Sequence, residues 1–153
     1  MAVYLVQHGK SLSKEVDPEK GLSDEGKAQV DRIAQVAAGY EVPVSRIVHS
    51  GKKRARQTAE CFADFLKPQE GVAQMAGLRP LDDVTAFAPD VERMDNCMIV
   101  GHLPFMERLT AYLITGDPEK PVIKFQNGGM VCLDQDPDQG GWIIKWALMP
   151  DIG

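Results

Sequence analysis

Short apolar runs recur along the chain, and each is followed by glycine or polar residues. Residues 3–6, 46–49 and 97–100 contain such runs. An apolar run of this length that gives way to a loop is typical of a strand buried on both faces of a sheet. The pattern therefore predicts three central strands.

Between these runs the apolar residues repeat at helical spacing. Ser23 is suited to be an N-cap, and the helix predicted after it ends at Gly39. Ser50 is expected to cap a second helix, which Pro68 ends, and Gly116 is expected to stop a third. Strands and helices therefore alternate over most of the chain.

The C-terminal part has a different pattern. Residues 129–133 and 142–146 are rich in strand formers, and the segment 134–141 between them is rich in Asp, Pro and Gly. This arrangement predicts a terminal β-hairpin. Trp142 and Trp146 are four residues apart, so a regular strand would place them on the same face.

Alternating strands and helices predict an α/β fold. The expected architecture is a three-layer αβα sandwich with a mostly parallel central sheet and right-handed crossovers. With 153 residues and no internal linker or repeat, the whole chain, 1–153, is expected to form a single domain.

Composition excludes several classes of protein. The net charge of −5 and pI near 5.2 argue against a nucleic-acid partner, which requires a basic face. No apolar run is long enough for a membrane span, and the first residues lack a basic leader, so we expect a cytoplasmic protein without a membrane partner. The three cysteines are widely spaced in apolar surroundings, which predicts buried thiols and neither metal nor cofactor.

All three histidines of the chain lie at predicted strand ends, where open parallel sheets bind ligands. They are His8, His49 and His102, and glycine lies one or two positions from each. Glycine lets backbone approach a ligand closely because no Cβ obstructs it. A phosphate is one ligand that uses such an approach.

A basic run follows the second of these strand ends. Four cations occur within residues 52–56, at the predicted start of a helix in an acidic protein. Positive charge at a helix N-terminus opposes the helix dipole. We interpret the run as an anion clamp, although a solvated basic turn is the alternative.

Four segments together resemble the histidine phosphatases, a phosphoglycerate mutase-like superfamily, and especially their small SixA-type phosphohistidine phosphatase branch. The resemblance covers nearly the whole chain. The segments are 5–9 (LVQHG), 22–29 (LSDEGKAQ), 50–58 (SGKKRARQT) and 100–104 (VGHLP).

The resemblance implies a phosphate pocket that contains Gln7, His8, Gly9, Arg54 and His102. His8 would attack phosphorus and form a phosphohistidine intermediate, while Arg54 and His102 would hold the non-bridging oxygens. Such chemistry requires an in-line nucleophile and donors around the equatorial oxygens. Because His8 must be neutral to attack, we expect its other ring nitrogen to donate to a backbone carbonyl, with Gly9 the candidate partner.

The chain departs from the family pattern at two places. The family has arginine where this chain has Gln7, so both a permanent charge and a bidentate donor are lost, and Lys10 or Lys52 could supply part of the charge. The general acid is also not evident. Asp83 is the best candidate and Asp82 the next, with an exposed turn carboxylate as the alternative.

A weak general acid favours one substrate class. An alkoxide needs protonation to leave, whereas imidazole, with a conjugate-acid pKa of about 6.5, leaves more easily. The expected function is therefore hydrolysis of phosphohistidine on a phosphorylated protein. The alternatives are a phosphatase of small phosphorylated substrates, and a phosphate- or phosphoprotein-binding module that lost catalysis with its arginine.

Overall fold

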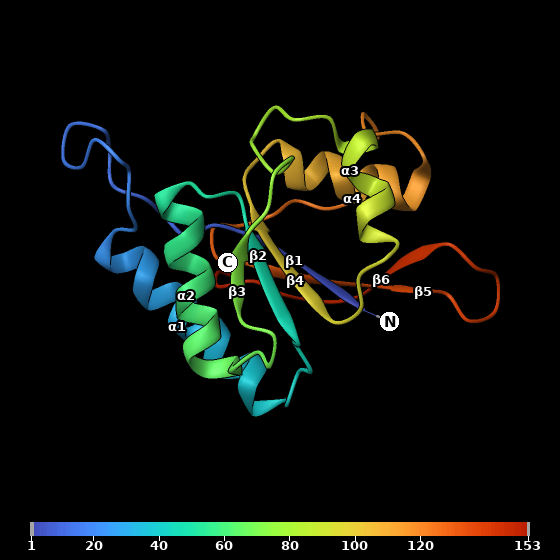
Figure 1. The fold of residues 1–153 in the computed structure, drawn as a ribbon, viewed down its shortest axis with the longest axis horizontal. Coiled ribbons are helices and arrows are strands. Elements are labelled where there is room, and N and C mark those ends of the chain that lie inside the picture. The colour runs from blue at the N-terminus through green and yellow to red at the C-terminus, as the bar shows by residue number, and fades with distance from the viewer. Residues whose placement is uncertain (1, 153) are drawn as a thin grey trace.

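The computed structural model describes residues 2–152 and contains one six-stranded sheet (Figure 1). The strand order is β3-β2-β4-β1-β5-β6, with the first four strands parallel and β5 antiparallel to both neighbours. The strands are β1 (Val3–Gln7), β2 (Arg46–His49), β3 (Val72–Gln74), β4 (Cys97–Gly101), β5 (Met130–Gln135) and β6 (Trp142–Leu148).

Four helices cover the two faces of this sheet and complete the expected three layers. They are α1 (Asp24–Gly39), α2 (Lys53–Leu66), α3 (Val84–Val91) and α4 (Phe105–Thr115). Apolar residues of α1 and α2 pack on one face of the sheet, and those of α3 and α4 pack on the other (Figure 1). No helix within residues 2–152 is long and apolar enough to cross a membrane.

Local signals explain most of the element boundaries. The Ser23 hydroxyl accepts a hydrogen bond from the Gly26 amide and caps α1, as predicted. Gly116 ends α4 at a φ of 82°, a conformation that glycine adopts without steric penalty. The prediction for Ser50 is wrong, because Lys52 is the N-cap of α2. The Ser50 hydroxyl accepts from the Lys52 amide at 3.3 Å and lies 2.6 Å from a histidine nitrogen.

Two elements, β3 and α3, were not predicted. β3 has only three residues at the edge of the sheet, so too few buried positions mark it. α3 has eight residues and contains Pro89, which usually argues against a helix. Its apolar residues, including Phe87 and Val91, nevertheless close the core on that face.

A β-bulge separates the two tryptophans. The pairing of β5 with β6 shifts register between Cys132 and Leu133. Because of an extra residue in one strand, every side chain beyond it lies on the opposite face of the sheet from that expected for a regular strand. Trp146 therefore packs with Tyr4 on the α1–α2 side, whereas Trp142 packs on the α3–α4 side, and the prediction of a common face is wrong.

The register of the central strands brings three loops together. Gln7 at the end of β1 pairs with Gly101 of β4, and His49 at the end of β2 pairs with Val100 of β4. Because these strands are parallel neighbours, their carboxyl ends lie at one edge of the sheet. The residues that follow them form the candidate site.

Candidate active site

The His8 imidazole is held in one orientation at the end of β1. Its Nδ1 lies 2.7 Å from the Gly9 carbonyl oxygen, so Nδ1 carries the proton and donates it there. The other ring nitrogen, Nε2, keeps its lone pair and accepts a hydrogen bond from Nε of Arg54 at 3.3 Å. The expected hydrogen bond to Gly9 is therefore present.

Burial keeps His8 uncharged. It lowers the His8 pKa to about 4, since desolvation outweighs the stabilising hydrogen bond to Gly9, and the positive charges of Arg54 and Lys20 act in the same direction as burial. The ring is therefore neutral at pH 7. A neutral imidazole with a free lone pair is a nucleophile.

Arg54 is placed by the first turn of α2, and Thr58 couples that turn to the strand end. The Thr58 hydroxyl donates to the Arg54 carbonyl at 2.8 Å and accepts from the Gly9 amide at 3.0 Å. One turn of α2 thus fixes both the arginine and the loop that carries the histidine. One helical position away, Gln57 accepts a hydrogen bond from the Leu22 amide at 2.7 Å.

His102 lies beside His8, with ring centroids 5.0 Å apart, and is almost fully buried. Its Nε2 is 2.6 Å from the Ser50 hydroxyl, while Nδ1 is buried without a partner among the described residues. Burial lowers the pKa of His102 to about 3, and electrostatic interactions with His8 and Arg54 act in the same direction. A buried ring nitrogen without a partner indicates a place for a further hydrogen-bonding group.

Gln7 is buried next to these rings. Its side-chain oxygen has no hydrogen-bond partner within residues 2–152. The site therefore has a polar, uncharged and unsatisfied group at the position where the resembling family has arginine.

Gly9 is required for close packing. A Cβ at this position would lie 2.8 Å from Cγ2 of Val30 and 3.2 Å from the Gly26 carbonyl oxygen. Its amide already donates to Thr58, so that group is occupied. The structure thus explains Gly9 by its contact with α1, and its expected role in phosphate binding stays a prediction.

The loop before β5 holds the backbone of Gln7 and His8 by hydrogen bonds. The Asn127 side chain donates to the His8 carbonyl at 3.1 Å, and the Gly128 amide donates to the Gln7 carbonyl at 2.9 Å. Gly128 has a φ of 77°, a left-handed conformation suited to glycine. The hydrogen bond from Asn127 to His8 joins residues 119 positions apart, so no local sequence signal marks it.

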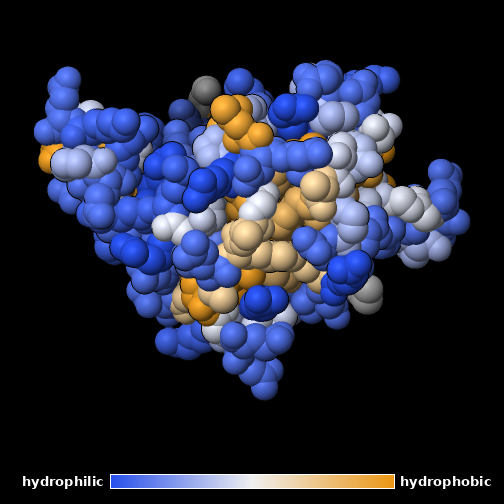
Figure 2. Space-filling model, turned by 45° about the horizontal axis from the view of Figure 1, so that its top comes forward, coloured by the Kyte–Doolittle hydropathy of each residue, from blue (hydrophilic) through white to orange (hydrophobic). Residues whose placement is uncertain are grey.

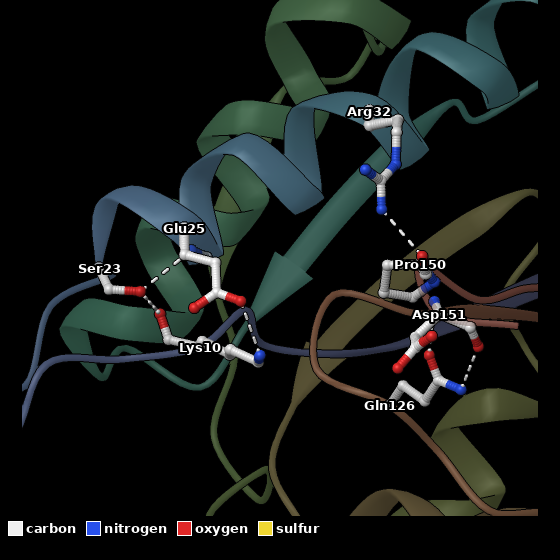
Figure 3. Close-up of polar contacts among 8 residues, drawn as sticks. Lys10, Ser23, Glu25, Arg32, Gln126, Pro150 and Asp151 are labelled. Atoms are coloured by element: carbon white, nitrogen blue, oxygen red, sulfur yellow. Dashed lines mark hydrogen bonds and ion pairs between the residues drawn. The ribbon is translucent and has the colours of Figure 1, made fainter. Parts of the chain in front are cut away.

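The C-terminal segment fastens the same loop. Gln126 donates to the Asp151 carbonyl at 2.7 Å and accepts from its amide at 2.9 Å, and Arg32 of α1 donates to the Pro150 carbonyl at 2.8 Å (Figure 3). Residues far apart in the sequence thus hold the supporting loop against α1.

Lys10 forms an ion pair with a residue outside the candidate site. Its ammonium group lies 2.9 Å from Glu25 at the start of α1, and its carbonyl accepts from Ser23 (Figure 3). Lys52 lowers the pKa of His102, so its charge does act on the site. Of the two lysines considered as substitutes for the missing arginine, Lys52 is the better placed.

The hydrogen bonds of the two carboxylate candidates go to groups other than the histidines. Asp83 is exposed and caps α3, accepting from the Thr85 amide at 2.9 Å and the Thr85 hydroxyl at 2.7 Å. These hydrogen bonds lower the pKa of Asp83, which disfavours proton donation. Asp82 lines a pocket of about 300 Å³ that also contacts Ser50, and it accepts from the Arg79 amide at 2.8 Å.

Within residues 2–152 no group of three acidic, cysteine or histidine residues is arranged to hold a metal ion. Cys61, Cys97 and Cys132 are free and buried, as expected. His49 accepts a hydrogen bond from the Gly51 amide at 3.0 Å, a local contact that shapes the turn.

Comparison with known proteins identifies the family and the fold. The model of the histidine phosphatase superfamily (branch 1) matches residues 3–83. A structure of the protein histidine phosphatase SixA complexed with tungstate superposes with a TM-score of 0.83 and 25% identity over 98% of this chain and 97% of the other. No curated protein matches the sequence.

Two further solved structures share the fold. A SixA-type protein from Agrobacterium tumefaciens has a TM-score of 0.78 and 24% identity over 97% of each chain. A mycobacterial glucosyl-3-phosphoglycerate phosphatase has a TM-score of 0.73 and 17% identity over 95% of this chain and 97% of the other.

Proposed function

The chain belongs to the histidine phosphatase superfamily, and from this premise we propose that it hydrolyses phosphohistidine on a protein, with His8 as the nucleophile. The observation that carries the proposal is the orientation of His8. Donation from Nδ1 to the Gly9 carbonyl leaves the Nε2 lone pair toward Arg54, the group that would bind the phosphoryl oxygens.

The reaction has two steps. Nε2 of His8 forms a bond to phosphorus while the bond from phosphorus to the imidazole nitrogen of the substrate breaks, and the substrate ring, protonated on its other nitrogen, leaves as neutral imidazole. Water then attacks phosphorus, the bond to Nε2 breaks, and inorganic phosphate leaves with both protons of the water, which returns His8 to its neutral form with the proton on Nδ1. The Arg54 guanidinium exchanges its contact with Nε2 for one with a phosphoryl oxygen, where its charge stabilises the transition state.

His102 is proposed to hold a second phosphoryl oxygen. If the Ser50 hydroxyl donates to Nε2, Nδ1 carries the proton and is the unsatisfied donor. A phosphoryl oxygen accepting from Nδ1 would satisfy it. Binding a dianion would also raise the depressed pKa of this ring.

The placement of the carboxylates favours a phosphoramidate over an ester. Among the described residues, no carboxylate hydrogen bonds with His8, Arg54 or His102. An alkoxide leaving group depends on a general acid, whereas imidazole depends on it far less. Should an acid take part, Asp82 beside Ser50 is better situated than Asp83, which caps α3.

One experiment tests the nucleophile. The protein is mixed with a phosphohistidine peptide, quenched without acid, and examined for covalent phosphate on His8 by mass spectrometry. Wild type is expected to carry the phosphate and to release inorganic phosphate, and His8→Ala to do neither. Faster turnover of p-nitrophenyl phosphate than of the peptide would instead favour an esterase of small substrates.

Gln7 favours a second candidate, a phosphate-binding module with little turnover. Loss of one charged donor at a transition state lowers the rate by about 10²–10³. Installing the charge by Gln7→Arg is expected to raise turnover of the phosphohistidine peptide by about that factor. Phosphate binding without turnover in both proteins would support the module and contradict the phosphatase.

A further inference from the structure

A strongly basic pocket opens next to His8. It has a volume of about 320 Å³ and lies between the loop after β1 and the start of α2. Six cations and one carboxylate line it, namely Lys14, Lys20, Lys52, Lys53, Arg54, Arg56 and Glu19. In a chain whose net charge is −5, so many cations would not be expected to gather in one pocket by chance.

Most of these cations are not neutralised by the protein. Lys53 pairs with Asp17 at 3.0 Å and with Glu19 at 3.5 Å. No ion pair within residues 2–152 involves Lys14, Lys20, Lys52 or Arg56. Mutually repelling cations destabilise the folded state unless an anion binds among them.

The N-terminus of α2, which borders this pocket, also favours the binding of anions. The first turn of α2 contains no acidic residue, and no side chain caps it. The first amides of a helix have no intrahelical acceptor and attract negative charge. The amides and the cations thus favour the same kind of ligand.

The pocket is held open by the protein itself. Asp17 accepts from the Gly21 amide at 2.9 Å and from Lys53 at 3.0 Å, which fastens the loop to α2. In Figure 1 this loop projects beyond α2, and the corresponding left-hand part of the surface in Figure 2 is mostly hydrophilic. A ligand therefore meets an ordered basic surface.

Arg54 connects the pocket with the reacting groups. It lines the pocket and donates to Nε2 of His8. Lys20 is also near both histidines, since its charge contributes to the lowered pKa of His8 and of His102. An occupant of the pocket would therefore lie beside a phosphoryl group on His8.

We propose that this pocket binds acidic side chains next to the phosphohistidine of a protein substrate. The inference rests on the proposed function and names the substrate class, a phosphohistidine in an acidic segment. The cations come from two segments, 14–20 and 52–56, and five of them line the pocket in addition to Arg54, which would bind the phosphoryl group. A row of carboxylates matches this spread and is repelled by the acidic remainder of the molecule.

The test uses two peptides that each carry one phosphohistidine, flanked by glutamates in one and by glutamines in the other. For wild type, kcat/KM is expected to be about tenfold higher for the acidic peptide at low ionic strength. The preference should shrink at 0.15 M salt, where the Debye length falls to about 8 Å. In Lys14→Glu/Lys20→Glu the preference is expected to disappear or reverse.

Arg93→Glu/Lys145→Glu is the matched control, because it changes the net charge equally near the opposite ends of the strands. It should keep the preference of wild type. Equal kcat/KM for the two peptides in wild type, or a preserved preference in the Lys14/Lys20 variant, overturns the inference. Failure of wild type to hydrolyse either peptide contradicts the proposed function instead, so the two failures are distinguishable.

Discussion

The amino and carboxyl ends of the parallel strands differ in the residues that surround them. At the amino end lies the larger pocket, about 510 Å³, bordered by Tyr4, Tyr40 and Trp146. At the carboxyl end lie five of the six buried polar residues described, Gln7, His49, Ser50, Thr58 and His102. The sixth, Thr110, donates to a carbonyl of its own helix.

This difference shows that pocket size alone does not indicate which end holds the candidate site. Apolar lining stabilises by burial and needs no ligand. Buried polar atoms without partners, such as Gln7 Oε1 and His102 Nδ1, destabilise the protein until something binds them. The polar groups at the carboxyl end therefore lower stability in the absence of a ligand. Substitutions at the carboxyl end should mainly lower activity, whereas substitutions at the amino end should mainly lower stability.

The largest difference in activity is expected between variants of two arginines, one at each end of the strands. Arg54→Ala should lower kcat/KM for a phosphohistidine peptide by about 10²–10³, because a charged donor to the transition state is lost. Arg46→Ala, an exposed arginine at the amino end of β2, should leave kcat/KM unchanged. Steady-state kinetics give kcat/KM for both variants. Equal losses of kcat/KM in the two would contradict a specific role for Arg54.

Trp146→Ala should act in the opposite way. The ring packs with Tyr4 and with the α1–α2 side of the core, so its removal is expected to lower the free energy of unfolding by about 2 kcal/mol. Turnover per folded molecule should not change. Urea unfolding and active-site-normalised kinetics measure the two quantities, and a large loss of kcat would show that the amino end does take part in the reaction.

Ser50→Ala is expected to have a smaller effect on rate. Its hydroxyl is 2.6 Å from His102 Nε2, and loss of one such hydrogen bond is worth about 1 kcal/mol, or about fivefold in kcat/KM. Ser45→Ala is the control, since the Ser45 hydroxyl donates only to backbone carbonyls before β4. Identical kinetics for the two variants would argue against orientation of His102 by Ser50.

The last prediction concerns the dependence of stability on pH. The pKa of His8 is about 4 in the folded protein and that of an ordinary histidine is 6.5, so the unfolded chain binds more protons between these values. Stability should therefore fall as pH falls from 6.5 toward 4, and less steeply in His8→Asn. At the amino end, burial raises the pKa of Tyr4 to about 12 and that of Cys132 to about 11, so these groups do not titrate in this range.

Urea midpoints at several pH values, together with imidazole chemical shifts, measure this dependence. A titration midpoint of His8 near 6.5 would mean that the ring is not desolvated. The nucleophile would then lose activity already at mildly acidic pH.

The parallel strands and their order of appearance could be predicted because burial on both faces leaves apolar runs at 3–6, 46–49 and 97–100. The grouping of His8, Arg54 and His102 followed from motif resemblance combined with the rule that parallel strand ends converge. The hairpin of β5 and β6 was also predicted, because its turn residues are local signals.

The bulge in that hairpin could not be predicted. The two tryptophans fit a period of two in the sequence, and a single extra residue in the pairing placed them on opposite faces. Asp83 is a similar case. Its carboxylate looked available in the sequence but is occupied as the cap of a helix whose proline concealed it.

The sequence alone determined which residues are the candidates for the chemistry, since residue type and local spacing specify strands, helix starts and the motif positions. Tertiary structure decided what each polar atom does. The partners of the site are remote along the chain, with Ser50 and His102 separated by 52 residues and Asn127 and His8 by 119. Hydrogen bonds have directions and periodic patterns do not, so only the folded chain determines that His8 presents Nε2 to Arg54.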